Sequence, residues 1–410
     1  MTFPALSNIT RPSAQKIVLR VSANAEKNIR RGHPWVFEKS ILKQSRHGAP
    51  GELAILFDAK REFLAIGLYD PTSPIRVRIL QSGKPAVINS NWLQEKIHTA
   101  SALRQPLNAP HTNGYRLVHG ENDGLPGLVV DRYADALVVK LYTPAWIPYL
   151  KEICGAFPSY KYIVLRFSRS AQKQTAALQG LADGSMLTSH TPPGAILFKE
   201  NGIIFECDPI NGQKTGFFLD QRENRERIRN LSQHKTVLNV FSYTGGFSLY
   251  AAAGGAKAVT SVDLSLPATQ AVLRNIKHNQ RLPEVRAAKF ETLTEDAFKA
   301  LTEMNAGGRK FDLVILDPPM FAQNQMQVEA ALSAYRRLTQ LGLSVLKSGG
   351  ILAQASCSSR VSAERFFESI HQAAQAARRP LQEIQRTGHA LDHPIAFKEG
   401  AYLKCLFAIA

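Results

Sequence analysis

The sequence has few cysteines and none of the spacings that bind metals. Only four of its 410 residues are cysteines, and Cys154, Cys207, Cys357 and Cys405 lie far apart. This excludes a disulfide-stabilised scaffold, and no CxxC or CxxxH pattern suggests zinc. We therefore expect free thiols and no metal site.

Long hydrophobic runs are also missing. No uninterrupted apolar stretch approaches the roughly 18 residues that cross a bilayer. The first 20 residues lack a basic segment followed by an apolar core, so a secretory signal is not expected. Hydrophobic residues make up 44% and charged residues 20%, which is globular composition and excludes a disordered chain or a coiled coil. The sequence predicts a cytoplasmic protein without a membrane partner.

Acidic residues are scarce relative to basic ones. The chain has 50 Lys and Arg against 33 Asp and Glu, a formal charge of +17, and residues 1–80 alone hold 13 basic and 6 acidic residues. Such a surplus favours a polyanionic partner, and nucleic acid is the commonest in the cytoplasm. The alternative is a solvated surface without a partner.

Three regions differ in their periodicity, and we expect domains at residues 1–90, 91–200 and 201–410. The first shows short apolar runs between turn residues, which is typical of a small β-barrel, and the second reads as an α+β unit. The third alternates strand and helix patterns, which predicts an α/β fold with a parallel sheet covered by helices on both faces. Its first five strand candidates are TVLNVF, AVTSVD, VRAAKF, FDLVILD and GILAQAS.

Cations stand beside aromatic residues near the start of the chain. Such a mixture is typical of RNA-binding surfaces. The candidates are Arg30, Arg31, His33 and Trp35. In the alternative interpretation, Trp35 and Phe37 pack into the small core of their domain.

In open α/β sheets, ligands bind beyond the carboxyl ends of the strands. The first strand of the third region runs into NVFSYTGGF, and two glycines there allow a tight turn and close backbone approach. Neither GxGxxG nor GxxxxGK[ST] is present, so a ligand without a pyrophosphate is expected. The candidate binding residues are Phe241, Tyr243, Thr244, Gly245 and Gly246.

Carboxylates follow the next strands. Asp263 ends the second strand and can accept both hydroxyls of a ribose. Glu295 and Asp296 follow the third strand, where they can bond an adenine amine. Asp317 begins a D-P-P segment after the fourth strand and is a further candidate for cofactor binding. The ordered set resembles class I S-adenosylmethionine-dependent methyltransferases; a dehydrogenase-like domain is the alternative.

Longer segments carry a closer resemblance. NGQKTGFFLDQRENR, RGHPWVFEKSI, ENDGLPGLVVDRY, DHP and YLK are similar to the bacterial large-subunit ribosomal RNA cytosine-C5 methyltransferase family. The likeness covers roughly residues 16–408, and it departs at FKEGAYLK, where that family more often has Pro before the Glu. It implies an N-terminal PUA barrel, a central α+β domain, a Rossmann-like catalytic domain, S-adenosylmethionine as cofactor and ribosomal RNA as partner. It also implies a second set of cofactor-binding residues: Lys214, Thr215, Gly216 and Asp220.

Methylation at C5 of cytosine needs a cysteine, because that carbon becomes nucleophilic only after a thiolate adds to C6. Cys357, in ASCSSRVSAERF, follows the fifth strand and precedes a helix, at the catalytic edge of the sheet. Within the resemblance it matches the nucleophile. Met320 stands where related two-cysteine enzymes have another cysteine, so a one-cysteine mechanism is implied. The alternative is a buried strand residue.

Asp317 would stabilise charge that builds toward N3 of the cytosine. The sequence does not identify the base that removes the C5 proton, and His389 and His393 are not expected to bind metal. Two other functions stay open: a purine (guanine) RNA methyltransferase on the same scaffold, and a non-catalytic RNA-binding or ribosome-assembly protein. Whether the chain acts as a homodimer is also undecided.

Overall fold

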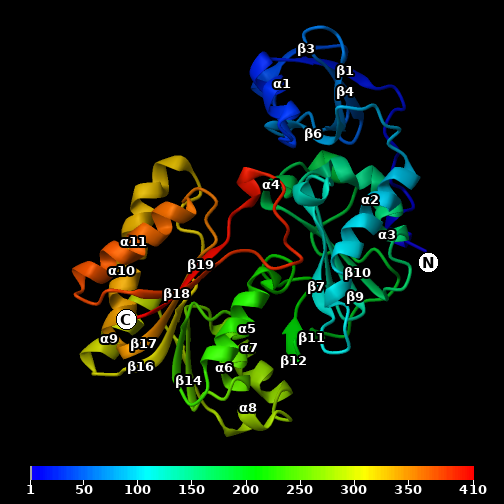
Figure 1. The fold of residues 1–410 in the computed structure, drawn as a ribbon. Helices are drawn as coiled ribbons and strands as arrows, with labels where there is room; N and C mark the ends of the chain where they lie inside the picture. The colour runs from blue at the N-terminus through cyan, green and yellow to red at the C-terminus, as the bar shows by residue number, and fades with distance from the viewer. Residues whose placement is uncertain (1) are drawn as a thin grey trace. The chain divides into compact units, whose positions relative to one another are not determined.

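The computed structural model describes residues 2–410, which form two compact units (Figure 1). Unit 1 comprises the chain up to Phe198, Cys207–Leu219 and Leu391–Gly400. Unit 2 comprises Lys199–Glu206, Asp220–Ala390 and Ala401–Ala410. The division into three domains at residues 90 and 200 stays a prediction.

Unit 1 begins with a six-stranded sheet in the order β2-β6-β5-β4-β1-β3. Along β1 every second side chain is buried, so one face of this strand lies on the core and the other faces solvent. Helix α1 buries Ala25 and Ile29 against the same core. The elements are β1 Ile17–Val21, α1 Ala23–Arg30, β2 Trp35–Phe37, β3 Ile41–Gln44, β4 Leu53–Phe57, β5 Phe63–Tyr69 and β6 Ile75–Ser82.

A four-stranded sheet in the order β10-β9-β8-β7 forms the second part of unit 1. Its apolar side chains share one core with helix α2 and with Trp146, the largest fully buried side chain. The elements are α2 Ser90–Leu103, β7 Gly114–His119, β8 Leu128–Tyr133, β9 Ala136–Leu141, α3 Leu150–Gly155, β10 Tyr162–Phe167 and α4 Arg169–Gln172. Two further strands, β11 Ile196–Glu200 and β12 Ile203–Cys207, pair where the chain passes between the units.

Unit 2 is built on a seven-stranded sheet in the order β15-β14-β13-β16-β17-β19-β18. The first five of these strands are parallel, whereas β19 runs antiparallel to both β17 and β18. The strand order reverses at β13, which lies between β14 and β16. The strands are β13 Thr236–Val240, β14 Ala258–Asp263, β15 Lys289–Thr294, β16 Phe311–Leu316, β17 Leu346–Ser356, β18 Gln382–Thr387 and β19 Lys404–Ile409.

Two groups of helices cover this sheet (Figure 1). Helix α6 packs against α5, α7 and α8, and α10 packs against α9 and α11. The helices are α5 Arg222–Leu231, α6 Gly246–Ala253, α7 Leu266–His278, α8 Pro283–Ala287, α9 Ala297–Ala306, α10 Val328–Ser344 and α11 Ala363–Ala376. Among residues 2–410, no helix has both the length and the apolar character that spanning a membrane requires.

One strand lies later in the chain than predicted. VRAAKF was expected as the third strand, but Pro283–Ala287 form α8 and β15 begins at Lys289. Proline at the first helical position supplies the φ angle a helix needs and loses no hydrogen bond there, which explains the short helix.

Candidate active site

The loop after β13 holds its backbone in an unusual conformation. Phe241 and Tyr243 have φ angles of 62° and 47°, and Gly245 has a φ angle of 82°. Left-handed backbone at non-glycine residues costs about 1–3 kcal/mol each and persists only where surrounding contacts enforce it. Here Ser242 N–H donates to the carbonyl of Val262 at 2.9 Å. Such strain at the reversal point of the sheet indicates a functional loop.

Asp263 is fixed beside this loop. Its Oδ2 accepts a 2.8 Å hydrogen bond from Tyr243 N–H, and its Oδ1 accepts one of 2.9 Å from Ser265 N–H. The side chain is only half-buried, and each carboxylate oxygen can accept a further donor. The carboxylate is therefore held in place and still able to accept two hydroxyls.

Two hydroxyls of the same loop lack hydrogen-bond partners. Ser242 Oγ and Thr244 Oγ1 are buried without one among the described residues. The Thr244 carbonyl, by contrast, accepts a 2.9 Å bond from Asn275 Nδ2. Buried polar groups almost always have hydrogen-bond partners, so a bound polar molecule would supply partners for these two hydroxyls.

Asp296 lies at the same edge of the sheet, because Thr294 at the end of β15 pairs with Asp263. Its Oδ1 accepts hydrogen bonds from the backbone N–H groups of Phe298 and Lys299, both at 3.0 Å, and caps helix α9. Its neighbour Glu295 pairs with Lys299, whose hydrogen bond lowers the pKa of that carboxyl group. The role of Asp296 toward an adenine amine stays a prediction.

Asp317 follows β16 and therefore lies next to the loop after β13, since Leu316 pairs with Val240. Its Oδ1 accepts a 3.0 Å hydrogen bond from Gln221 Nε2. Gln221 Oε1 in turn accepts a 2.6 Å bond from Asn224 Nδ2. A buried amide chain thus orients this carboxylate.

Cys357 follows the last residue of β17, Ser356, whose hydroxyl lies 2.8 Å from that of Tyr335. It is the one half-buried cysteine, whereas the other three are buried. Burial raises the pKa of the Cys154 thiol to about 12, and it also raises the pKa values of Cys207 and Cys405. Only Cys357 has the exposure that a reacting thiol requires.

The unit 2 candidates thus gather at one edge of the sheet, at the ends of β13, β14, β15, β16 and β17. Asp220 is also in unit 2, where its Oδ2 accepts a 2.9 Å bond from Tyr402 OH. Lys214, Thr215 and Gly216 belong to unit 1. Thr215 Oγ1 donates to Asp131 Oδ2 at 2.6 Å, so this hydroxyl already has a partner.

The predicted RNA-binding residues lie in unit 1. Arg30 pairs with Asp58 at 2.7 Å, whereas Arg31 is exposed. Trp35 packs edge-on against Phe397 at 5.3 Å between ring centroids, with His33 at 5.6 Å. The Trp35 indole N–H donates to Glu121. Trp35 is therefore held by packing, and its contact with RNA stays a prediction.

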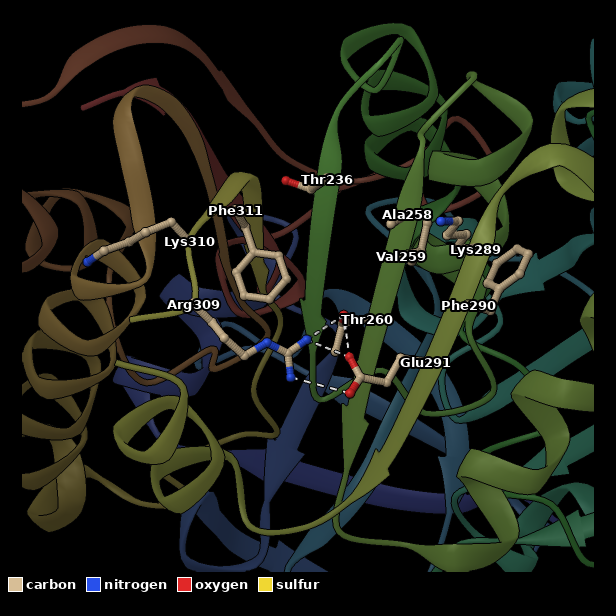
Figure 2. Close-up of a pocket in the computed structure, with 10 residues that line it drawn as sticks. All are labelled: Thr236, Ala258, Val259, Thr260, Lys289, Phe290, Glu291, Arg309, Lys310 and Phe311. Atoms are coloured by element: carbon tan, nitrogen blue, oxygen red, sulfur yellow. Dashed lines mark hydrogen bonds and ion pairs between the residues drawn. The ribbon is translucent and has the colours of Figure 1, made fainter. Parts of the chain in front are cut away.

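A cavity of about 360 Å³ lies at the opposite edge of the unit 2 sheet. Figure 2 shows that its lining includes the first residues of four parallel strands, with Arg309 and Glu291 paired across it at 2.5 Å. Ligands of open α/β sheets bind at the carboxyl ends of the strands, so this cavity does not mark the active site. Within the described part of the chain, no three side chains are grouped as a metal site requires.

The sequence interpretation missed two residues of this edge. Gln221 orients Asp317, and Lys404 is buried beside the loop that carries Cys357. Both stand in segments already noted for their resemblance, NGQKTGFFLDQRENR and YLK, but nothing in their spacing indicates these contacts. A lysine that begins a buried strand is the one signal that could have drawn attention to Lys404.

Known proteins resemble the whole chain. Residues 19–82 match the PUA-like domain family, and residues 185–388 match an S-adenosylmethionine-dependent methyltransferase family. A ribosomal RNA large subunit methyltransferase of Deinococcus radiodurans is 46% identical over 404 residues, covering 96% of this chain and 98% of that protein. The ribosomal RNA large subunit methyltransferase I of Aliivibrio fischeri (strain ES114) is 36% identical over 392 residues, covering 95% and 98%.

Solved structures agree on the fold. A putative S-adenosylmethionine-dependent methyltransferase from Streptococcus mutans superposes with a TM-score of 0.80 over 96% of this chain and 100% of that one, at 23% identity. A putative methyltransferase complexed with SAH (S-adenosylhomocysteine) gives 0.81 over the same shares, at 24% identity. The predicted fold, a PUA-like domain followed by a Rossmann-like domain, is confirmed, and so is the cofactor, S-adenosylmethionine.

Proposed function

Because this chain belongs to the S-adenosylmethionine-dependent methyltransferase family whose members include the ribosomal RNA large subunit methyltransferases, we propose that it makes 5-methylcytosine in large-subunit ribosomal RNA. The observation that carries the proposal is the half-buried Cys357 at the carboxyl end of β17, in the same unit as Asp263 and Asp317. Amino-group methylation needs no thiol, whereas C5 methylation does.

In this proposal the strand-end residues hold the cofactor. The Asp263 carboxylate would accept the ribose hydroxyls, the loop from Phe241 to Gly246 would hold the cofactor, and the hydroxyls of Ser242 and Thr244 would gain partners. Asp296 would accept from the adenine amine. When bound, S-adenosylmethionine supplies a methyl group on a positively charged sulfur, ready for attack by a nucleophile.

Cys357 makes the cytosine ring nucleophilic. Its thiolate forms a bond to C6, and the electron pair of the C5–C6 double bond moves onto the ring toward N3. Asp317, oriented by Gln221 and in its protonated, carboxylic-acid form, donates a hydrogen bond to N3 at this stage. C5 would then take the methyl group, whose bond to the cofactor sulfur breaks to leave a neutral thioether. A base removes the C5 proton, and the electron pair left at C5 restores the double bond as the thiolate departs.

The RNA partner accords with the charge of the chain. The formal charge of +17 provides cations for phosphates, and the name of the relatives gives large-subunit ribosomal RNA as the substrate class. Arg31, exposed in the PUA-like domain, is one candidate contact.

Nucleoside analysis tests the proposal. The protein is incubated with S-adenosylmethionine carrying a labelled methyl group and with unmodified large-subunit ribosomal RNA, and the digested nucleosides are identified by mass spectrometry. Labelled 5-methylcytidine is the expected product, and it should vanish with Cys357→Ala but persist with Cys154→Ala, a cysteine of unit 1. Labelled methylguanosine would contradict the cytosine assignment, and no labelled nucleoside would contradict methyl transfer to this RNA.

A further inference from the structure

Lys404 is a buried lysine that the catalytic scheme above does not use. It is the first residue of β19, and only 4% of its surface is exposed. Its ammonium donates to three backbone carbonyls: those of Ser358, of Val361 at 2.7 Å and of Tyr402 at 3.2 Å. An ammonium has three donors, so all of them are engaged.

The partners of the Lys404 ammonium are backbone carbonyls and not carboxylates. Buried charges are normally paired with an opposite charge. Burial lowers the pKa of Lys404 to about 8, and the nearby Cys357 and Glu364 oppose that shift. The lysine is therefore still mostly protonated at neutral pH. Of these two groups Cys357 has the larger effect, and Glu364 is exposed, where solvent screens its charge.

Lys404 contacts residues that stand before and after Cys357 in the sequence. Ser356 pairs with Lys404 between β17 and β19, and two of the carbonyl acceptors, Ser358 and Val361, follow Cys357 directly. The ammonium thus ties down the short loop between β17 and α11 that carries the thiol. A displacement of Lys404 would free the loop and remove the buried cation together.

We infer that Lys404 is a positioning residue that holds the loop of Cys357 and stabilises its sulfur as a thiolate before RNA arrives. The inference rests on the proposed function, because it gives Cys357 the part of nucleophile. The thiolate, not the thiol, attacks C6, so a preformed thiolate raises the fraction of enzyme ready to react.

Other groups around Cys357 have weaker or opposite effects. Tyr335 is neutral, since burial raises its pKa well above the usual value, and its environment includes both Cys357 and Asp317. Asp317, when it is ionised, disfavours a second negative charge nearby. Arg360 is a cation of the same loop, but it is exposed. Lys404, in contrast, is a buried cation whose charge favours the thiolate.

Alkylation of the free enzyme measures this directly. Iodoacetamide labelling of Cys357 is followed by peptide mass spectrometry between pH 5 and 10, without RNA or cofactor. Because the other three cysteines are buried, Cys357 gives the signal. The wild-type profile should show an apparent thiol pKa at least about one unit below the ordinary value of about 8.5. The Cys357 thiol and the Lys404 ammonium titrate as a coupled pair, so the apparent pKa from this profile describes the pair and not the thiol alone.

Variants assign the effect to Lys404. Lys404→Met should raise the apparent thiol pKa by about one unit or more and slow alkylation at pH 7 about tenfold, and Lys404→Arg should restore part of the rate. Lys277→Met removes an exposed lysine of the same unit and should leave the alkylation profile unchanged. Thermal unfolding and S-adenosylmethionine affinity check that each variant is folded.

Two results would overturn the inference: a wild-type thiol pKa at or above about 8.5, or a folded Lys404→Met whose alkylation profile equals that of the wild type. The first needs no variant, so it decides even if Lys404→Met does not fold. A lowered thiol pKa in an enzyme that makes no 5-methylcytidine would refute the proposed function and leave this inference standing. Cytosine methylation with an ordinary thiol pKa would do the reverse.

Discussion

The side-chain amide of Gln221 donates a 3.0 Å hydrogen bond to Oδ1 of Asp317. Gln221 is buried and is itself held by Asn224, whose Oδ1 accepts a 2.5 Å bond from Thr387 Oγ1. The side-chain amides of Asn224, in α5, and Gln221, just before α5, therefore form a hydrogen-bonded chain that ends at the Asp317 carboxyl group. In the proposed reaction the protonated carboxyl group of Asp317 donates a hydrogen bond to N3 of the cytosine, so its orientation affects the stability of the Cys357 adduct.

Replacing Gln221 should slow the reaction without weakening cofactor binding. Gln221→Ala leaves Asp317 without one of its hydrogen bonds, and we expect kcat to fall about tenfold, the equivalent of about 1.4 kcal/mol. The dissociation constant of S-adenosylmethionine, measured by isothermal titration, should change less than about twofold. The exposed Gln233 serves as the control: Gln233→Ala should match the wild type. A Gln221→Ala enzyme with unchanged kcat would remove Gln221 from the account.

Replacing Asp263 should weaken the binding of S-adenosylmethionine. Asp263→Ala removes the proposed acceptor of the ribose hydroxyls and the acceptor of the Tyr243 and Ser265 N–H groups. We expect S-adenosylmethionine to bind at least about 1.5 kcal/mol more weakly, which is more than tenfold. Glu303→Ala is the matched control, because it removes one exposed carboxylate, and it should bind S-adenosylmethionine as the wild type does. Unchanged affinity in Asp263→Ala would move the cofactor away from this strand end.

Asp312 should stabilise unit 2 in a pH-dependent way. Partial burial opposes its ionisation, but hydrogen bonds from Thr236 and Lys347 outweigh this and lower its pKa to about 2. A carboxyl group with a lowered pKa stabilises the fold above its unfolded pKa of about 3.9, and that contribution is lost as the pH falls toward the folded value. Asp312→Asn should therefore cost about 1 kcal/mol at pH 7, and less at pH 3. Urea unfolding at both pH values measures the difference; equal losses at the two would contradict this assignment.

Arg31 should contribute to RNA binding through charge alone. It is exposed, whereas the neighbouring Arg30 is engaged with Asp58 and Glu26. If Arg31 contacts one phosphate, Arg31→Ala should lower the slope of log affinity against log salt by about 1. Lys173, an exposed cation of the same unit, is the comparison, and Lys173→Ala should keep the wild-type slope. Equal slopes for all three proteins would make Arg31 a solvated surface residue.

Much of unit 2 could be predicted because parallel strands buried on both faces read as short apolar runs. TVLNVF and FDLVILD were predicted as strands, and β13 and β16 begin where predicted and end one residue earlier. The loops that follow them lie at one edge of the sheet. The third strand was misplaced because VRAAKF combines a β-branched residue with other apolar ones, although Pro283 stands two residues before it. Local pattern cannot decide between a strand and a one-turn helix of that length.

What the sequence could not reveal depends on long-range contacts. Packing, and not periodicity, decides which unit the last segments join. Leu391–Gly400 belongs to unit 1, whereas Ala401–Ala410 belongs to unit 2 and contributes β19 to its sheet. The same holds for Lys404, whose three carbonyl partners are brought to it by pairing of β19 with β17. The left-handed backbone at Phe241 and Tyr243 is equally invisible, since neither residue type favours it.

Trapping the covalent intermediate tests the central claim, that the Cys357 sulfur bonds to C6 of cytosine during methyl transfer. The wild-type protein is incubated with S-adenosylmethionine and ribosomal RNA in which cytosine is replaced by 5-fluorocytosine, and the protein–RNA complex is digested for peptide mass spectrometry. Fluorine at C5 cannot leave as a cation, so the adduct should accumulate after methylation with the nucleotide attached to Cys357. Cys357→Ala and Cys357→Ser should form no complex and transfer no methyl group. A Cys357→Ala enzyme that still methylates its RNA at near wild-type rate, or a wild-type enzyme that methylates cytosine without any adduct, would contradict the account.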